Sequence, residues 1–266
     1  MLHLATSLFL LVPAADPATA LDAGYRQMYN LDFSAAHGSF AEWIKQHPAD
    51  PLGPVSDAAA YLFAEFDRLH ILQSEFFMHD ENFRTSQRLS ADLNVQQNFE
   101  RRLAEGDRLV QLALSRNADD ANALFAKVLM LGLRSDYEGL IEKKYLSSLS
   151  TTKTGRYTAE KLLSIDPNYH DAWLAIGVEN YLLSLKPLPV RWFLQLHGNA
   201  TDRDLGLAKL RVTAERGRYL KPFARLLLAV AALRDRDRAR ARTLLQDLSK
   251  EFPRNHLYAE ELARLQ

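Results

Sequence analysis

The first stretch whose residue types could do chemistry contains two possible metal ligands. Glu75 and His79 stand four residues apart in LHILQSEFFMHDENF, the spacing that places two ligands on one face of a helix. His70 lies off that face, and two ligands do not hold a metal ion. We therefore interpret the stretch as a polar helix end with an exposed histidine, and we predict no metal site.

Paired acids stand in a second stretch, HGNATDRDLG. Asp202 and Asp204 could act as paired carboxylates or belong to a calcium loop, but the acid that such a loop needs at its twelfth position is missing. Capping of the next helix by Asp202 or Thr201 is the better interpretation. Asn199-Ala200-Thr201 also fits the sequon for N-glycosylation.

An arginine-rich tract, RDRDRARAR, spans residues 234–242. Asp235 and Asp237 interrupt it, and no aromatic residue interleaves with the arginines. The chain has 33 Lys and Arg against 33 Asp and Glu, so its formal net charge is zero. We expect a solvated turn between helices, with arginines in salt bridges, and no nucleic-acid partner.

Signatures of several enzyme classes are missing from the sequence. The chain has no cysteine, which excludes thiolate nucleophiles, disulfides and cysteine-based zinc sites. It contains neither a glycine-rich phosphate-binding motif nor the GxSxG motif. A dispersed catalytic triad would leave no such signature, but nothing points to one. We predict no catalytic residue and no cofactor.

The elements that position these residues are predicted to be helices. Glycine is scarce, at 11 residues, prolines fall between the apolar segments, and the apolar residues recur with a period near 3.6. We expect Asp32 and Ser56 to cap two of the helices. The sequence predicts an all-α fold with helical segments within 20–31, 32–48, 56–77, 94–117, 119–137, 139–166, 164–183, 190–217, 221–235, 238–253 and 256–266.

Four helix ends look alike. They are KQHPADP (45–51), SRNADDA (115–121), SIDPNYHDA (164–172) and KEFPRNH (250–256), with Ala118 at the place that proline holds in the other three. Two of the prolines have apolar residues, small or large, at the positions twelve, eight and five residues before them. These residues are Ala36, Phe40 and Trp43 before Pro48, and Ala241, Leu245 and Leu248 before Pro253.

These positions resemble the tetratricopeptide repeat, a helix–turn–helix unit of about 34 residues. The resemblance implies stacked antiparallel helix pairs in a solenoid, with small and large residues packed between helices. The irregular marker spacing requires insertions, such as the segment 188–198, and a non-repetitive helical bundle is the alternative. The predicted packing residues are Ala36, Phe40, Trp43, Pro48, Pro167, Trp173, Ile176, Gly177, Ala241, Leu245 and Pro253.

The function that the resemblance implies is non-catalytic protein–protein interaction or scaffolding, with a protein or peptide partner on the concave face. Asn180, Tyr181 and Trp192 are the predicted groove residues, although a core position is the alternative for Tyr181 and Trp192. A second hypothesis is an enzyme or small-ligand-binding protein with a pocket near residues 188–204.

The first residues resemble an export signal. An apolar run, Leu2 to Val12, is followed by Ala18-Thr19-Ala20, which has the form of a signal-peptidase site, and Val12-Pro13-Ala14 is a looser alternative. We predict a signal peptide at 1–20, a single domain at 21–266, and a periplasmic or secreted protein without a membrane span in the mature chain. Since no basic residue precedes Arg26, a cytoplasmic protein is the alternative.

Overall fold

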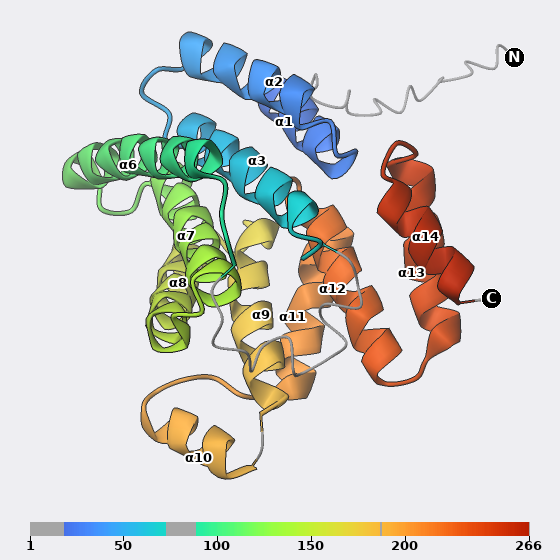
Figure 1. Cartoon of the computed structure of the whole chain (residues 1–266). Coiled ribbons are helices and arrows are strands. Elements are labelled where there is room, and N and C mark those ends of the chain that lie inside the picture. The colour runs from blue at the N-terminus through green and yellow to red at the C-terminus, as the bar shows by residue number, and fades with distance from the viewer. Residues whose placement is uncertain (1–18, 73–88, 187, 266) are drawn as a thin grey trace, which may run out of the picture.

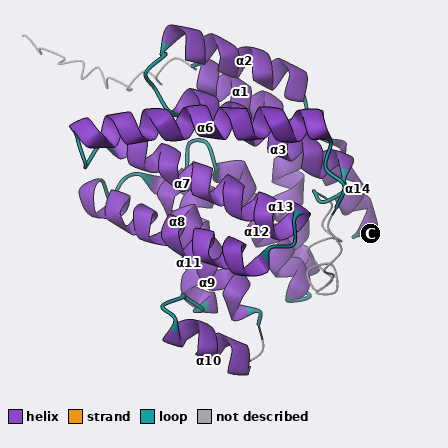
Figure 2. Cartoon of the chain, turned by 60° about the vertical axis from the view of Figure 1, so that its left-hand side comes forward, coloured by secondary structure: helices purple, strands orange, loops and turns teal. Residues whose placement is uncertain are grey.

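The computed structural model of the chain describes residues 19–72, 89–186 and 188–265. Every regular element in these ranges is a helix (Figures 1 and 2). The α-helices are α1 (Ala20–Tyr29), α2 (Phe33–Gln46), α3 (Leu52–Arg68), α6 (Leu93–Arg116), α7 (Ala121–Asp136), α8 (Tyr145–Ile165), α9 (Trp173–Ser184), α10 (Leu188–Leu196), α11 (Arg203–Arg216), α12 (Lys221–Arg234), α13 (Arg238–Glu251) and α14 (His256–Arg264). A π-helical turn, η1 (Tyr137–Ile141), follows α7, and a short 3-10 helix, η2 (His170–Ala172), precedes α9.

The helices pack as neighbouring pairs, which confirms the predicted all-α architecture. The pairs are α1 with α2, α3 with α6, α7 with α8, α9 with α11, and α12 with α13, and α14 packs on α13. Each pair also contacts the next one along the chain, so the array is continuous (Figure 1). Helix α10 is inserted between the members of the fourth pair and projects from one end of the molecule.

The four similar helix ends form four similar turns. In each, the first residue after the helix donates its N–H to a carbonyl one turn back, and the residue three further on donates to that first residue. At Pro48 these bonds are His47 N–H to Trp43 O (2.8 Å) and Asp50 N–H to His47 O (3.0 Å). The predicted prolines therefore lie in exposed turns, where the missing N–H costs no hydrogen bond.

Most of the predicted packing residues are buried. Ala36, Phe40, Ile176, Gly177, Ala241 and Leu245 lie in the interior, whereas Trp43 and Trp173 are half-buried at its edge. Gly177 lies against Leu210, so a β-carbon there would come within 2.9 Å of the leucine side chain. A small residue opposite a large one therefore brings the paired helices α9 and α11 close together.

One predicted cap is right and another is wrong. The Asp32 carboxylate accepts the N–H of Ala35 and caps α2. Ser56 is not a cap, because α3 begins four residues earlier, at Leu52, and Ser56 is buried inside it beside the Tyr25 hydroxyl (3.0 Å). Pro54 did not delay the helix, since a proline fits in the first helical turn.

The two ends of the array contact each other. The Tyr29 hydroxyl donates to the carbonyl of Tyr219 (2.9 Å), and the Asn255 amide donates to the carbonyl of Tyr29 (2.9 Å). Arg218 pairs with Asp22 (2.8 Å), and the Tyr25 ring stacks on the Tyr219 ring. The first pair thus packs against the loop before α12 and the turn before α14, which encloses the concave side of the array.

Candidate functional site: an apolar cavity enclosed by the helix pairs

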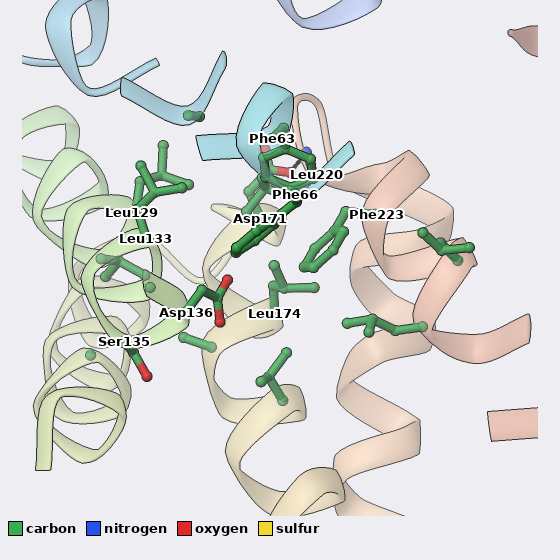
Figure 3. Close-up of a pocket in the computed structure, with 18 of the residues that line it drawn as sticks. Phe63, Phe66, Leu129, Leu133, Ser135, Asp136, Asp171, Leu174, Leu220 and Phe223 are labelled. Atoms are coloured by element: carbon green, nitrogen blue, oxygen red, sulfur yellow. Dashed lines mark hydrogen bonds between the residues drawn. The ribbon is translucent and has the colours of Figure 1, made fainter. Parts of the chain in front are cut away.

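The enclosed side of the array contains a cavity of ≈ 190 Å³. The first helices of all five pairs, α1, α3, α7, α9 and α12, contribute to its wall (Figure 3). Apolar side chains dominate this wall, among them Phe63, Leu129, Leu174, Phe223 and Leu226. Leu182, at the end of α9, also lines the cavity and is 40 % exposed, so the cavity reaches the molecular surface there.

Two carboxyl groups interrupt the apolar wall, and one of them is fully engaged. Asp171 accepts backbone N–H groups of Arg218 (2.9 Å), Tyr219 (3.3 Å) and Leu220 (2.9 Å). Burial raises the pKa of Asp171 although these N–H groups act in the opposite direction. Its role is structural, because it holds the loop that leads into α12.

The other carboxyl group, Asp136, is the last residue of α7. Its side chain points from α7 into the cavity toward Leu174 (Figure 3). It makes no hydrogen bond or ion pair with any residue that the structure describes. Burial raises the pKa of Asp136 from 3.8 to about 7, because the apolar surroundings disfavour the charged form. Asp136 is therefore a half-buried acceptor that the described protein groups leave unused.

The serine and threonine hydroxyl groups of the wall already have hydrogen-bond partners. The Ser135 hydroxyl lies 2.6 Å from that of Thr152 and 3.0 Å from that of Ser148. Thr152 donates to the carbonyl of Ser148 (2.8 Å). These bonds join α7 to α8, and so they leave Asp136 as the polar group directed at the space itself.

Asn180 and Tyr181, predicted as groove residues, do not line this cavity. Each is 2 % exposed and faces α11 and the segment before it. The Asn180 side-chain oxygen accepts the N–H of Asp202 (3.0 Å), and its amide donates to the carbonyl of Ile176 (3.0 Å). A β-carbon at Gly206 would stand 2.5 Å from the Tyr181 nitrogen. Both residues therefore serve packing between α9 and α11.

Trp192 lies on α10, none of whose residues lines the cavity, and it is 66 % exposed. Leu188, Phe193 and Leu196 of the same helix are exposed as well. The segment 188–204 is held to the body by Glu179, which accepts the N–H of Ala200 (3.0 Å) and pairs with Arg156 (2.8 Å). None of its residues lines this cavity.

The structure also shows where the other candidate residues of the sequence analysis lie. Asp202 caps α11 and Asp237 caps α13, each by accepting a backbone N–H, while Asp204 is exposed. Glu75 and His79 lie outside the described residues. Within the described ranges, His, Asp and Glu side chains form no group of three that could hold a metal ion.

The prediction from sequence missed Asp136. The signal is present in ALFAKVLMLGLRSDY, where Asp136 follows Leu129 and Gly132 on one helix face at intervals of three and four. An acidic residue on an otherwise apolar helix face is unusual. The sequence of one helix does not show whether that face packs against other helices or borders a cavity.

Comparison with known proteins does not assign the chain to a family. No protein-family model matches the chain, and no curated protein shows significant similarity to it. Among the described helices, none is both long enough and apolar enough to cross a bilayer.

Proposed function

We propose that this protein is a non-catalytic binding protein that takes an apolar ligand, or the apolar part of one, into the cavity. The observation that carries the proposal is the apolar wall assembled from the first helices of all five pairs. A dry apolar cavity of about 150 Å³ is large enough to bind benzene, so one of ≈ 190 Å³ accommodates a somewhat larger apolar group.

Closure of the array favours a compact ligand over an extended peptide. The contacts of Tyr29 with Tyr219 and Asn255 occupy the place at which an open array would leave its groove accessible. Ligand pockets are typically concave and apolar, with a few polar groups that fix orientation. The cavity fits this description, with Asp136 as its free polar group.

Gly132 offers a direct test. It lines the cavity, and a β-carbon built on it meets nothing within 4 Å. Gly132→Leu should fill part of the cavity and weaken binding of an apolar probe, such as n-octanol measured by calorimetry, by roughly fourfold or more for each methylene displaced. This variant should fold, because leucine has a higher helix propensity than glycine.

The matched control is Gly38→Leu, since Gly38 is likewise an exposed glycine in mid-helix with free space at its β-carbon but lies on α2, outside the cavity lining. Binding by the control should equal that of the wild type. Failure of the wild type to bind any apolar probe, or undiminished binding by folded Gly132→Leu, would contradict the proposed function.

Protein–protein interaction, which the tetratricopeptide resemblance implies, is a second candidate, and the exposed apolar face of α10 supports it. Leu188, Trp192, Phe193 and Leu196 of this one short helix are each more than half exposed. A partner protein with a complementary apolar surface would bury them, and exposed apolar patches commonly mark such contacts. A purified partner should lose at least about tenfold in affinity with Trp192→Ser; equal affinity would exclude α10 as the contact.

We also propose that the protein is exported. The cap at the start of α1 favours one of the two predicted signal-peptidase sites over the other. The Thr19 hydroxyl accepts the N–H of Asp22 (3.2 Å), and the Asp22 carboxylate accepts the N–H of Thr19 (2.8 Å). Cleavage after Ala20 would remove this cap, whereas cleavage after Ala14 would keep it. N-terminal sequencing of exported protein should therefore find a start before Thr19.

A further inference from the structure

The cavity contains an acceptor without a donor. Asp136 points into a space lined mainly by leucine, valine and phenylalanine side chains. Neither of its oxygens has a hydrogen-bond partner among the residues that the structure describes. Asp136 is half-buried. A polar group that loses part of its hydration without gaining a partner costs free energy, and that cost falls when a ligand supplies the missing donor.

We propose that the ligand of this cavity carries a basic nitrogen on its apolar body, and that the Asp136 carboxylate accepts the N–H of that nitrogen. This inference rests on the proposed function, since it concerns the ligand of the same cavity. A protonated amine has several donors and a charge opposite to that of the carboxylate, so it satisfies Asp136 more completely than a neutral hydroxyl group does. A carboxylate ligand would be repelled.

Other polar groups of the wall do not compete for this role. Asp171 is occupied by three backbone N–H groups, and Ser135 and Thr152 bond to each other and to Ser148. The charged neighbours of Asp136 along the chain are engaged elsewhere, because Arg134 pairs with Glu100 of α6 and Glu138 accepts the Thr151 hydroxyl. The basic nitrogen would therefore be oriented by Asp136 alone.

Binding of an amine should depend on pH. Asp136 must be ionised to attract a cation, and its pKa is raised to about 7. The other titratable groups of the lining are Asp171, Tyr25 and Tyr29, whose pKa values burial also raises; α3, α8, α9 and α12 contribute none. The tyrosines stay neutral at pH 6 to 8, and a variant of Asp136 separates its contribution from that of Asp171.

The experiment compares three probes that share one chain length: n-octylamine, n-octanol and sodium octanoate. Each is titrated into the purified full chain at pH 6 and pH 8 by isothermal calorimetry. We expect octylamine to bind at least about tenfold more tightly than octanol at pH 8, as a charge-assisted hydrogen bond implies. Its advantage should shrink at pH 6, and octanoate should bind most weakly at pH 8.

Asp136→Asn should remove both the preference for octylamine and its pH dependence while octanol still binds. The control is Asp204→Asn, at an exposed carboxyl group on α11, which should behave as the wild type. Equal affinities of wild type for octylamine and octanol, or tighter binding of octanoate, would overturn this inference and leave the proposed function standing. Binding of none of the three probes would overturn the proposed function and this inference with it.

Discussion

At the scale of single residues, Asp136 sets the chemical character of the cavity. It ends an otherwise apolar face of α7, and the helices around it supply neither a donor nor a positive charge. Asp171, in the same wall, shows the contrasting case, since three backbone N–H groups satisfy it. The two acids differ in their partners, so one stabilises the fold and the other is available to a ligand.

The raised pKa of Asp136 predicts how stability depends on pH. The unfolded chain loses this proton near pH 3.8, whereas the folded chain keeps it until about pH 7. The contribution of Asp136 to the free energy of unfolding therefore falls as pH rises from about 4 to 7. Asp136→Asn should melt higher than the wild type at pH 8, by roughly 2–4 °C for each kcal/mol gained, and the gap should narrow at pH 5.

Circular dichroism melts of both proteins at pH 5, 6.5 and 8 measure this gap. Asp204→Asn serves as the control, because its carboxyl group is exposed and lies outside the cavity. A wild type more stable than Asp136→Asn at pH 8 would mean that the carboxylate has a stabilising partner, contrary to the structure.

At the scale of elements, close approach between paired helices depends on glycines in mid-helix. Gly206 of α11 faces the backbone of α9, and a β-carbon there would stand 2.5 Å from the Tyr181 nitrogen and 3.0 Å from the Gly177 carbonyl oxygen. Backbone atoms cannot rotate aside as a side chain can, so a methyl group must push the two helices apart.

Gly206→Ala is therefore expected to lower the free energy of unfolding by about 1–3 kcal/mol, although alanine favours helices. Gly38→Ala, where a β-carbon meets nothing within 4 Å, should raise it by up to about 1 kcal/mol. Urea denaturation followed by circular dichroism gives both values. A stabilising Gly206→Ala would show that the α9–α11 contact is looser than its geometry indicates.

At the scale of the whole molecule, contacts between the two ends of the array enclose the cavity. Asn255 has two tasks there: its side-chain oxygen caps α14 through the N–H of Leu257 (3.1 Å), and its amide donates to the Tyr29 carbonyl (2.9 Å). Asp120 holds the same place in the turn before α7 and caps that helix with a carboxylate. An aspartate at residue 255 can therefore keep the cap but not the contact between the ends.

We expect Asn255→Asp to reduce the free energy of unfolding by about 1–3 kcal/mol, since a buried carbonyl loses its donor. Hydrogen exchange should show faster opening of α1 and α14 than in the wild type, with α7 and α8 unchanged. The reciprocal variant Asp120→Asn retains a capping oxygen and should change neither quantity. Unchanged exchange in α1 would mean that the end contact does not restrain the first pair.

The helices and their turns could be predicted from the sequence because their causes are local. Apolar spacing, caps such as Asp32 and Asp202, and prolines such as Pro48 and Pro253 act within a few residues of themselves. The start of α3 was predicted wrongly at Ser56, since a buried serine bonded to Tyr25 has the same sequence signature as a cap. The all-α class followed from these local patterns, and the stacking of helix pairs was implied by the resemblance of the helix ends to the tetratricopeptide repeat.

The enclosure of the concave side and the cavity within it were decided by tertiary structure alone. Tyr29 bonds to residues 190 and 226 positions away, and no pattern in the sequence joins such distant segments. The cavity wall combines residues from Tyr25 to Val230, each of which has an ordinary apolar neighbourhood in sequence. Whether Asp136 meets solvent, a partner or an empty space depends on how five helix pairs curve, because curvature sums small packing differences along the whole array.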